Sequence, residues 1–500
     1  MAMEKRSISR AKLGLLVGIL FCSIIITLKI TLTPTIVSIS TKVSLPTTMS
    51  LKQDSHYYSS SSSPQPLLSP PPPPPVIPPP PPLQPRPPPQ ENKESTIEKQ
   101  TKQSPPESLP ENRIMCDRTP SRYDLCKISG PTVVDPNTFT FFELGPTRST
   151  RPNLIQKIQP YPRKYEEYIM AHIKNITLIS GPRGPTCKVH HNTTALVFSA
   201  GGYTGNFFHD FNDGFIPLFI TVNTIFHDEQ DFVIVITEGP DWWIRKYANL
   251  LHVFSKHPVV ALGNDKSTHC FPSAHLGLIS HGFMLINQTM LPNSKTYQHF
   301  HDLLHQAYGQ GHQMRPTSRP RIVLVSRKGS GGRVIINQRK LIRVMKQIGF
   351  DVILFEPTLK TPLEESYALI SSSHVMIGVH GAALTHSLFL RPGAVFVQIV
   401  PIGVDWAAHA FFAKAAGQMN LEYIEYGIGV EESSLVDKYG KNSTLLKDPF
   451  ALQRNGKGWP TEIMDIYLKK QNVRLDLVRF KSCLKEAYKK AKLFMYQQEK

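Results

Sequence analysis

The sequence predicts an α/β protein with two lobes, placed behind an N-terminal transmembrane helix and a proline-rich stem. Short apolar runs alternate with amphipathic helical patterns over residues 116–500, as in parallel sheets covered by helices on both sides. A proline- and serine-rich stretch separates this region from an apolar run near the start of the chain. A folded region of this length suits two domains of average size.

Residues 13–32 form an apolar run that follows a short basic segment, residues 1–12. The run is near the lower length limit of a transmembrane helix, about 17 residues. Positive charge on its N-terminal side predicts a cytosolic tail and a lumenal remainder, so the chain is expected to be single-pass and type II. A cleaved signal peptide is the alternative, but no clear small-x-small cleavage site follows the run.

Residues 33–115 contain few large apolar residues and the tracts Pro70–Pro75 and Pro78–Pro82. Such a composition cannot form a core and predicts a disordered stem. Proline tracts favour the polyproline II conformation, about 3.1 Å per residue, which would hold a domain away from a membrane. A ligand for a proline-reading module is the alternative, but it requires a cytosolic location that the predicted topology denies.

Residues 116–500 carry features of a lumenal chain. Four Asn-x-Ser/Thr sequons are candidate glycosylation sites: Asn175, Asn192, Asn287 and Asn442. Five cysteines lie beyond the anchor, so some should pair in an oxidising compartment: Cys116, Cys126, Cys187, Cys270 and Cys483. The first two are close enough for a local bridge, the odd number leaves one thiol over, and the remaining pairing cannot be deduced. The spacings do not resemble a zinc site.

The formal net charge is +18 and is spread along the chain. A solvated basic surface is one explanation, and a basic cleft for an anionic substrate is another. No nucleic-acid-binding module is recognisable, so we expect no nucleic-acid partner. A homo- or hetero-oligomer remains open.

The first predicted lobe covers residues 116–315. A strand at 194–199 leads through the Gly-rich turn 200–206 into a helical pattern that ends at Phe226, and further strands or helices are expected at 232–237, 242–254, 259–262 and 276–280. His209 and Asp213 are spaced i, i+4 and share a helical face. Such a pair can supply a general base. The alternative is a polar helix N-terminus with an Asp cap and a hydrogen-bonded histidine.

The second predicted lobe covers residues 316–460 and is followed by a helical segment, 461–500. Strands are expected at 321–326, 351–355, 375–379, 394–400 and 421–426, and helices at 337–347, 363–371, 382–390 and 406–416. In doubly wound sheets, ligands bind outside the carboxyl ends of the strands. His380 and Gly381 follow the strand at 375–379 directly. Two lobes of this kind would enclose a cleft, where ligands are favoured.

Residues at these strand ends predict a nucleotide pocket in the second lobe. Gly381 allows close approach to the backbone, and the N–H groups that begin the next helix, from Ala382 on, face an anion such as a diphosphate. Arg327 and Arg333 suit phosphate oxygens, and Glu356 suits the two hydroxyls of a ribose. A tight turn with a packed histidine is the alternative. The chain has no Asp-x-Asp pair, so we expect no obligatory metal and no other cofactor.

Several separated motifs resemble plant members of glycosyltransferase family 61. They are Ser199–Asp213, Ser326-Arg327, Ile377–His386 with Arg391–Gly393, and the stretch Cys116–Cys126 that opens the lumenal region. The resemblance covers nearly all of residues 116–500. It implies a GT-B-like fold of two Rossmann-like lobes, a UDP-sugar donor in the C-terminal lobe, an inverting mechanism and no metal.

The plant branch of that family adds xylosyl or arabinofuranosyl side chains to xylan in the Golgi. The resemblance therefore implies a UDP-pentose donor, a xylan or related acceptor and a Golgi membrane location. By position, Asn206, His209 and Asp213 match the family's Asn-x-x-His-x-x-x-Asp pattern, so His209 or Asp213 is the expected catalytic base. Asn206 and Asp210 are expected acceptor or positioning residues. His380, Gly381, Ala382 and Thr385 match the family's His-Gly-Ala-Gly-Leu-Thr pattern and are expected to bind the donor, together with Arg327, Arg333 and Glu356 from the strand ends. Ala383 departs from the glycine found in many members.

Three alternatives remain. One is a transferase acting on N-glycans or glycoproteins, and another is a non-catalytic lumenal carbohydrate-binding protein with the same fold. A serine hydrolase is disfavoured because the chain lacks a Gly-x-Ser-x-Gly elbow.

Overall fold

The structure is a computed structural model that describes residues 113–145, 154–181, 183–227, 229–311, 317–329, 331–452 and 461–498. All of these residues belong to one compact unit. The predicted tail, anchor and most of the stem lie outside the described residues. Within the ranges given above, no helix is both long enough and apolar enough to cross a bilayer.

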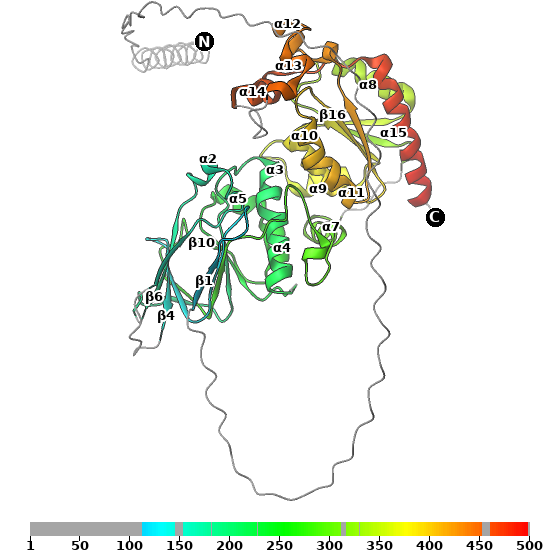
Figure 1. Cartoon of the computed structure of the whole chain (residues 1–500). Coiled ribbons are helices and arrows are strands. Elements are labelled where there is room, and N and C mark those ends of the chain that lie inside the picture. Colours follow the sequence, from blue (N-terminus) through cyan, green and yellow to red (C-terminus); the bar gives the residue numbers. More distant parts are fainter. Residues whose placement is uncertain are drawn as a thin grey trace, which may run out of the picture. The chain divides into compact units, whose positions relative to one another are not determined.

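The described chain is a mixed α/β fold with three sheets, which confirms the predicted class at that level (Figure 1). We call residues 113–311 the front region and residues 317–498 the rear region. Two six-stranded sheets belong to the front region and one five-stranded sheet to the rear region.

The first front sheet contains the strand that leads into the Gly-rich turn. Its strands, in spatial order, are β1 (Ile114–Asp117), β2 (Leu125–Ile128), β12 (Ala274–Leu276), β8 (Ala195–Phe198), β9 (Val233–Ile236) and β10 (Val260–Ala261). The four strands from β12 to β10 are parallel, and β1 and β2 are added antiparallel at one edge.

A second front sheet covers one face of the first, where helices were expected. Its order is β5 (Leu154–Ile158), β6 (Ile176–Gly181), β4 (Thr140–Leu144), β3 (Thr132–Asp135), β11 (His269–Phe271) and β7 (Val189–His190). Side chains alternate along β8, so Val197 packs with Phe141 and Leu178 of the second sheet, while Leu196 and Phe198 pack with the helices. The expectation of helices on both faces is therefore wrong for the front region.

The rear sheet is entirely parallel, with helices on both faces as predicted (Figure 1). Its order is β14 (Asp351–Phe355), β13 (Arg321–Val325), β15 (Val375–Val379), β16 (Val395–Val400) and β17 (Glu422–Gly427). Numbered by their order in the chain, the strands lie 2-1-3-4-5 across the sheet. The direction in which successive strands are added therefore reverses between β13 and β15. That reversal is where open parallel sheets bind ligands.

Helices of the front region are α2 (Glu167–Met170), α3 (Phe207–His209), η1 (Asp210–Phe215), α4 (Ile216–Ile225), α5 (Asp241–Lys246), α6 (Ala248–Phe254), η2 (Gln288–Met290) and α7 (Tyr297–Tyr308). Those of the rear region are α8 (Gln338–Ile348), α9 (Leu363–Ser371), η3 (Ala382–Phe389), α10 (Asp405–Ala408), η4 (His409–Ala413), α11 (Lys414–Gln418), η5 (Val430–Glu432), α12 (Leu435–Tyr439), α13 (Thr444–Lys447), η6 (Pro449–Leu452), α14 (Thr461–Asp465), η7 (Ile466–Lys470) and α15 (Leu477–Gln498).

The helix expected after Gly381 is a 3-10 helix, η3. Its turns close between residues three apart, starting with the bond from Leu384 N to Gly381 O at 2.9 Å. The ring of His386 hydrogen-bonds the carbonyl of Ala383 at 2.8 Å, which occupies an acceptor that an α-helix would use.

One apolar cluster joins the front helices to the rear sheet. Phe211 and Phe219 belong to it, as do Phe389 and Phe396. The start of α3 packs on η3, because the ring of Phe207 stacks on that of His386 with centroids 4.1 Å apart. The Gly-rich turn of the front region is therefore beside the turn after β15.

Candidate active site

A glycine-rich turn places the start of α3 against Tyr161. Gly202 has a φ of 65°, and a Cβ at that position would lie 2.6 Å from the Tyr161 ring. Only glycine fits this backbone and this contact. Asn206 then caps α3, because its side-chain oxygen accepts from the N–H of Phe208 at 3.1 Å.

The helix that follows widens into a π-helical segment, η1, directly after His209. Such segments are rare and occur frequently at functional sites. Within it Asp213 turns inward and is 2% exposed. His209 Nδ1 lies 2.8 Å from Asp213 Oδ2, so the two residues predicted to share a face are in direct contact.

Both carboxylate oxygens of Asp213 are occupied. Oδ2 accepts from His209 and from the hydroxyl of Tyr161 at 2.8 Å, and Oδ1 accepts from Arg163 Nε at 2.8 Å and Asn212 Nδ2 at 2.5 Å. Burial raises the pKa of Asp213, but the His209 hydrogen bond and the Arg163 charge outweigh it, so the net shift is downward. Asp213 is therefore an anion at neutral pH.

The contact with Asp213 fixes the tautomer of His209. An ionised carboxylate only accepts, so Nδ1 must carry the hydrogen, and in the neutral ring the lone pair is on Nε2. Arg163 Nη2 is 3.0 Å from the same Nδ1, but both groups are then donors, so this is proximity rather than a hydrogen bond. Tyr203 stacks on the imidazole with centroids 4.1 Å apart, and the side chain of His209 remains 17% exposed. His209 thus presents Nε2 as a proton acceptor.

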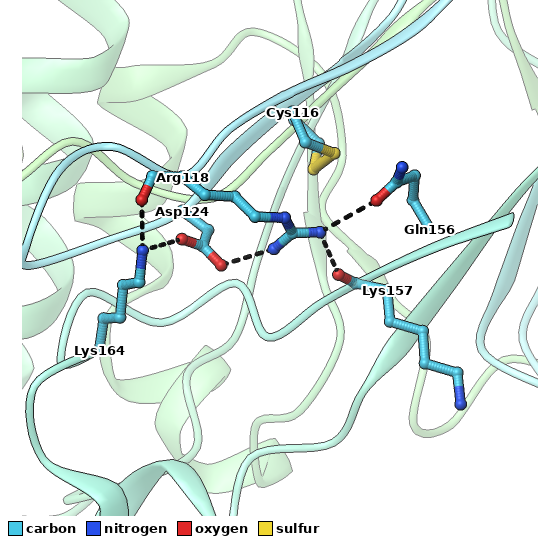
Figure 2. Close-up of a disulfide and its surroundings, with 7 residues drawn as sticks. Cys116, Arg118, Asp124, Gln156, Lys157 and Lys164 are labelled. Carbon is cyan, nitrogen blue, oxygen red and sulfur yellow. Dashed lines mark hydrogen bonds and ion pairs between the residues drawn. A yellow bond between two sulfur atoms is a disulfide. The ribbon is translucent and has the colours of Figure 1, made fainter.

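Tyr161 and Arg163 are not among the site residues predicted from the sequence. Both come from the connector between β5 and α2, about fifty positions before Asp213. Figure 2 shows how the neighbouring Lys164 is fixed: its ammonium contacts Asp124 at 2.8 Å and the carbonyl of Arg118 at 2.5 Å. The motif Pro-Tyr-Pro-Arg (160–163) is visible in the sequence, but no neighbouring residue in the chain indicates a function for it.

Asp210 is held from the opposite side of the same helix. Its two oxygens accept from Trp243 Nε1 at 2.9 Å and from the hydroxyl of Tyr247 at 2.8 Å. Burial raises its pKa, against the lowering effect of these bonds. Asp210 therefore ties α5 and α6 to the helix that carries His209, and its oxygens are engaged within the fold.

In the rear region, Arg327 and Arg333 converge on Gly381 at the reversal between β13 and β15. A Cβ on Gly381 would lie 2.9 Å from Arg333 Nη1 and 3.1 Å from Arg327 Nη2. Within the described ranges, neither guanidinium forms an ion pair, and the buried Nε of Arg333 has no hydrogen-bond partner. Burial and the charge of Arg327 lower the pKa of Arg333 to about 9, which still leaves it charged at neutral pH.

His380 directly follows β15 and has a neutral imidazole that can donate a hydrogen bond. It is 4% exposed, and burial with the charges of Arg333 and Arg327 lowers its pKa to about 3. Its Nδ1 accepts from Gln398 Nε2 at 2.8 Å, and the oxygen of Gln398 accepts from Tyr423. The Tyr423 hydroxyl also lies 3.0 Å from Glu425 Oε2, so it does not by itself fix the Gln398 amide. With Gln398 in this orientation, Nδ1 accepts and the hydrogen of the neutral ring is on Nε2.

The other predicted donor-site residues differ in their surroundings. Ala382 begins η3, where the first N–H groups lack partners inside the helix. Thr385 is fully buried, and its hydroxyl has no partner among the residues that the structure describes. Glu356 lies at the end of β14 and holds Ser326 at 3.0 Å and Lys328 at 2.5 Å. The hydrogen bond from Lys328 lowers the pKa of Glu356.

Two groups of site residues are called the front cluster (Tyr161, Arg163, His209 and Asp213) and the rear cluster (Arg327, Arg333, His380 and Gly381). Phe411 lies between them. Its ring centroid is 4.9 Å from that of Phe208, next to His209, and 6.4 Å from that of His380. Arg163 lies over Phe283, which in turn contacts Phe411 with centroids 5.0 Å apart. The two clusters are therefore close to each other in the fold, with Phe411 between them.

Two disulfides are present, Cys116–Cys126 and Cys187–Cys270, and Cys483 is a buried free thiol. The expected local bridge and the single unpaired thiol are confirmed. His190 lies beside the second disulfide, whose sulfurs are not available as thiolate ligands. Of the predicted glycosylation sites, Asn175, Asn192 and Asn442 are exposed, and Asn287 is partly buried.

Comparison with known proteins identifies relatives of the chain. The family model for glycosyltransferase 61 matches residues 205–397. The xylan glycosyltransferase MUCI21 of Arabidopsis thaliana is 38% identical over 422 residues, which cover 80% of this chain and 84% of that protein. In Oryza sativa subsp. japonica, the alpha-1,3-arabinosyltransferase XAT3 is 34% identical over 383 residues (75% of this chain, 65% of that protein), and the beta-1,2-xylosyltransferase XYXT1 is 30% identical over 405 residues (76% and 85%). The resemblance seen in the motifs is confirmed, and the chain belongs to glycosyltransferase family 61.

Proposed function

We propose that this protein transfers a pentose, xylose or arabinofuranose, from a UDP-sugar to xylan with inversion at the anomeric carbon. The observation that carries the proposal is the pair of buried guanidinium groups beside Gly381, which lack counterions among the described residues. Phe411 links this pair to the cluster in which Asp213 orients His209. An anion is the missing partner of the rear cluster, and an alcohol is a suitable partner for the front cluster. The relatives' names supply the pentose and the acceptor polymer.

The rear cluster suits the diphosphate of the donor. Arg327 and Arg333 neutralise its charge, and the N–H groups at the start of η3 and Nε2–H of His380 donate to its oxygens. These groups are fixed before the reaction, so they stabilise the charge that develops on the departing UDP. Glu356 takes the ribose hydroxyls, and the buried Thr385 supports the turn.

The front cluster suits proton removal from the acceptor. Nε2 of His209 takes the proton of the attacking hydroxyl as its oxygen bonds to the anomeric carbon, and the electrons of the breaking bond leave with UDP. Asp213 stabilises the imidazolium that forms, so it acts through His209 rather than as the base itself. Attack opposite to the leaving group gives inversion.

The GT-B-like assignment belongs to the same proposal. The parallel strands of the first front sheet, β10-β9-β8-β12, follow the order 3-2-1-4, which matches the first four positions of the six-stranded Rossmann order 3-2-1-4-5-6. The rear sheet follows the related order 2-1-3-4-5. Two such sheets with their turns facing one site support a two-lobed transferase, in which the second front sheet is an addition.

A Golgi membrane location with a lumenal catalytic region is supported by the two disulfides and the three exposed sequons. The measurement is digestion of intact microsomes, in which a C-terminal tag should be protected until detergent is added. Endoglycosidase treatment should increase the electrophoretic mobility of the protein. Cleavage of the tag without detergent would contradict the type II orientation.

The deciding experiment is a donor screen of the soluble lumenal region. UDP-xylose and UDP-arabinofuranose are offered with xylo-oligosaccharides, and the product linkage and anomeric configuration are read by NMR. One donor should give a product of inverted configuration, and His209→Gln is the matched inactive control. Transfer to N-glycans or proteins but not to xylo-oligosaccharides would overturn the acceptor assignment.

A further inference from the structure

A row of aromatic rings runs from the two clusters to Arg122, which has no counterion among the residues that the structure describes. It consists of Trp406, Phe411, Phe283 and Tyr165, with successive centroids 5.5, 5.0 and 6.3 Å apart. Tyr165 is 43% exposed and Trp406 is 38% exposed, and the two phenylalanines are partly buried. Half-exposed rings beside a transferase site are suitable surfaces for the C–H faces of sugar rings.

Arg122 stands at the end of this row. Its guanidinium carbon lies 5.4 Å from the centroid of Tyr165 and 5.0 Å from that of Phe283. The guanidinium carbon of Arg163 lies 6.0 Å from the Tyr165 centroid and 5.4 Å from the Phe283 centroid. Cation–π contacts of this kind fix the plane of Arg122.

The three arginines around this surface differ in their partners. Arg118 pairs with Asp124 at 2.7 Å (Figure 2), and Arg163 pairs with Asp213 and Glu166. Arg122 forms no ion pair within the described ranges, although it is only partly exposed. A preoriented guanidinium without a counterion is suited to a carboxylate, which it can bind with two parallel hydrogen bonds.

The backbone around this surface is fixed by the catalytic cluster itself. Lys164 N donates to the carbonyl of Arg122 at 3.0 Å, which joins Arg122 to the connector that carries Arg163. Met284, next to Phe283, donates its N–H to Asn212 at 2.7 Å, and Asn212 donates to Asp213. A group bound at Arg122 would therefore keep a constant position relative to His209.

We propose that Tyr165, Phe283 and Arg122 form an acceptor subsite that binds a sugar unit carrying a carboxylate, a uronic acid, within the acceptor chain. The inference rests on the proposed transferase function and adds a preference for an acidic acceptor. The rings bind the sugar face, and Arg122 binds the carboxylate at a distance from the reacting hydroxyl.

The test compares Arg122→Gln with Arg474→Gln, an exposed arginine of the rear region that also lacks an ion pair within the described ranges. Each variant is assayed on a neutral xylo-oligosaccharide and on the same oligosaccharide with one glucuronic acid substituent. Arg122→Gln should raise KM about 10- to 100-fold for the acidic acceptor alone. Arg474→Gln should change neither value, and Tyr165→Ala should raise KM for both acceptors.

Binding without a donor separates this inference from the proposed function. NMR titration of the wild-type protein should show tighter binding of the acidic oligosaccharide, with a difference that shrinks as salt is added. Equal affinities, or an equal effect of Arg122→Gln on both acceptors, would overturn the subsite. If no donor supports transfer while the acidic oligosaccharide still binds through Arg122, the proposed function fails and the subsite stands.

Discussion

The front and rear clusters bury arginines under opposite conditions. Arg163 is enclosed with two carboxylates, Asp213 and Glu166, so every charge in the front cluster has a partner within the protein. Arg327 and Arg333 lie side by side with no counterion within the described ranges, and burial lowers the pKa of both. The front cluster is complete without a ligand, whereas the rear cluster needs an anion.

This difference assigns distinct tasks to the two clusters. A balanced set of charges holds His209 in one tautomer at a low cost in stability, which a base requires. Two like charges near each other destabilise the unliganded fold and stabilise the complex with a diphosphate.

The largest expected effect is on turnover in His209→Gln. Loss of the base should lower kcat by roughly 10² to 10⁴-fold. The affinity for UDP, measured by calorimetry, should stay unchanged because the rear cluster is intact. Turnover close to that of the wild-type protein would remove His209 from the mechanism.

Arg163→Met should destabilise the protein by about 3–5 kcal/mol, because it leaves Asp213 buried without its cation. Denaturant unfolding of the ligand-free protein measures this free energy. The same substitution at Arg333 should leave the free energy of unfolding unchanged or raise it, since it removes one of two like charges. Equal destabilisation by both variants would show that the rear arginines already have a counterion.

Arg333→Met should weaken UDP binding about 10- to 100-fold, as expected for loss of hydrogen bonds to a charged group, each worth about 1.5–3 kcal/mol. Calorimetry with UDP and with uridine gives a sharper comparison, because uridine lacks the diphosphate. The affinity for uridine should stay the same in wild type and variant. A similar loss for both ligands would place Arg333 away from the diphosphate.

His380→Asn tests the neutral histidine in the rear cluster. The native pKa of about 3 lies below the ordinary 6.5, so between these values the unfolded state holds the extra proton and stability falls as pH falls. Replacing the imidazole should reduce the slope of the free energy of unfolding against pH by about 1.4 kcal/mol per pH unit between pH 6 and 4. An asparagine oxygen can still accept from Gln398. An identical slope in the variant would mean that His380 is protonated in the folded protein.

The local parts of the fold and of the site followed from the sequence, because their determinants are close together in the chain. β15 and α9 cover the residues predicted for them, 375–379 and 363–371. His209 and Asp213 meet because i, i+4 spacing persists through the π-helical turn. The clustering of Arg327 and Arg333 at Gly381 follows from parallel strands that share one carboxyl edge.

The parts of the fold and of the site that depend on contacts between residues far apart in the chain could not be predicted from the sequence. In the second front sheet, Val133 pairs with Cys270, and nothing near either residue indicates this partner. Tyr161 and Arg163 reach Asp213 only because Lys164 and the strands around it fix their connector. Tertiary packing determines such contacts. The periodicity of apolar residues, two in a strand and 3.6 in a helix, does not indicate them.

The smallest expected effect is that of a chelator. A donor-bound divalent cation would supply the positive charge that stabilises the departing diphosphate. Here two guanidinium groups converge on the same place, and the chain lacks the Asp-x-Asp pair that would hold a cation there. Incubation with excess EDTA, followed by removal of the chelator, should therefore leave kcat within about twofold of its initial value. A larger loss that Mn²⁺ restores would show that the unpaired arginines do not suffice, and that the rear cluster completes its charge balance with a metal.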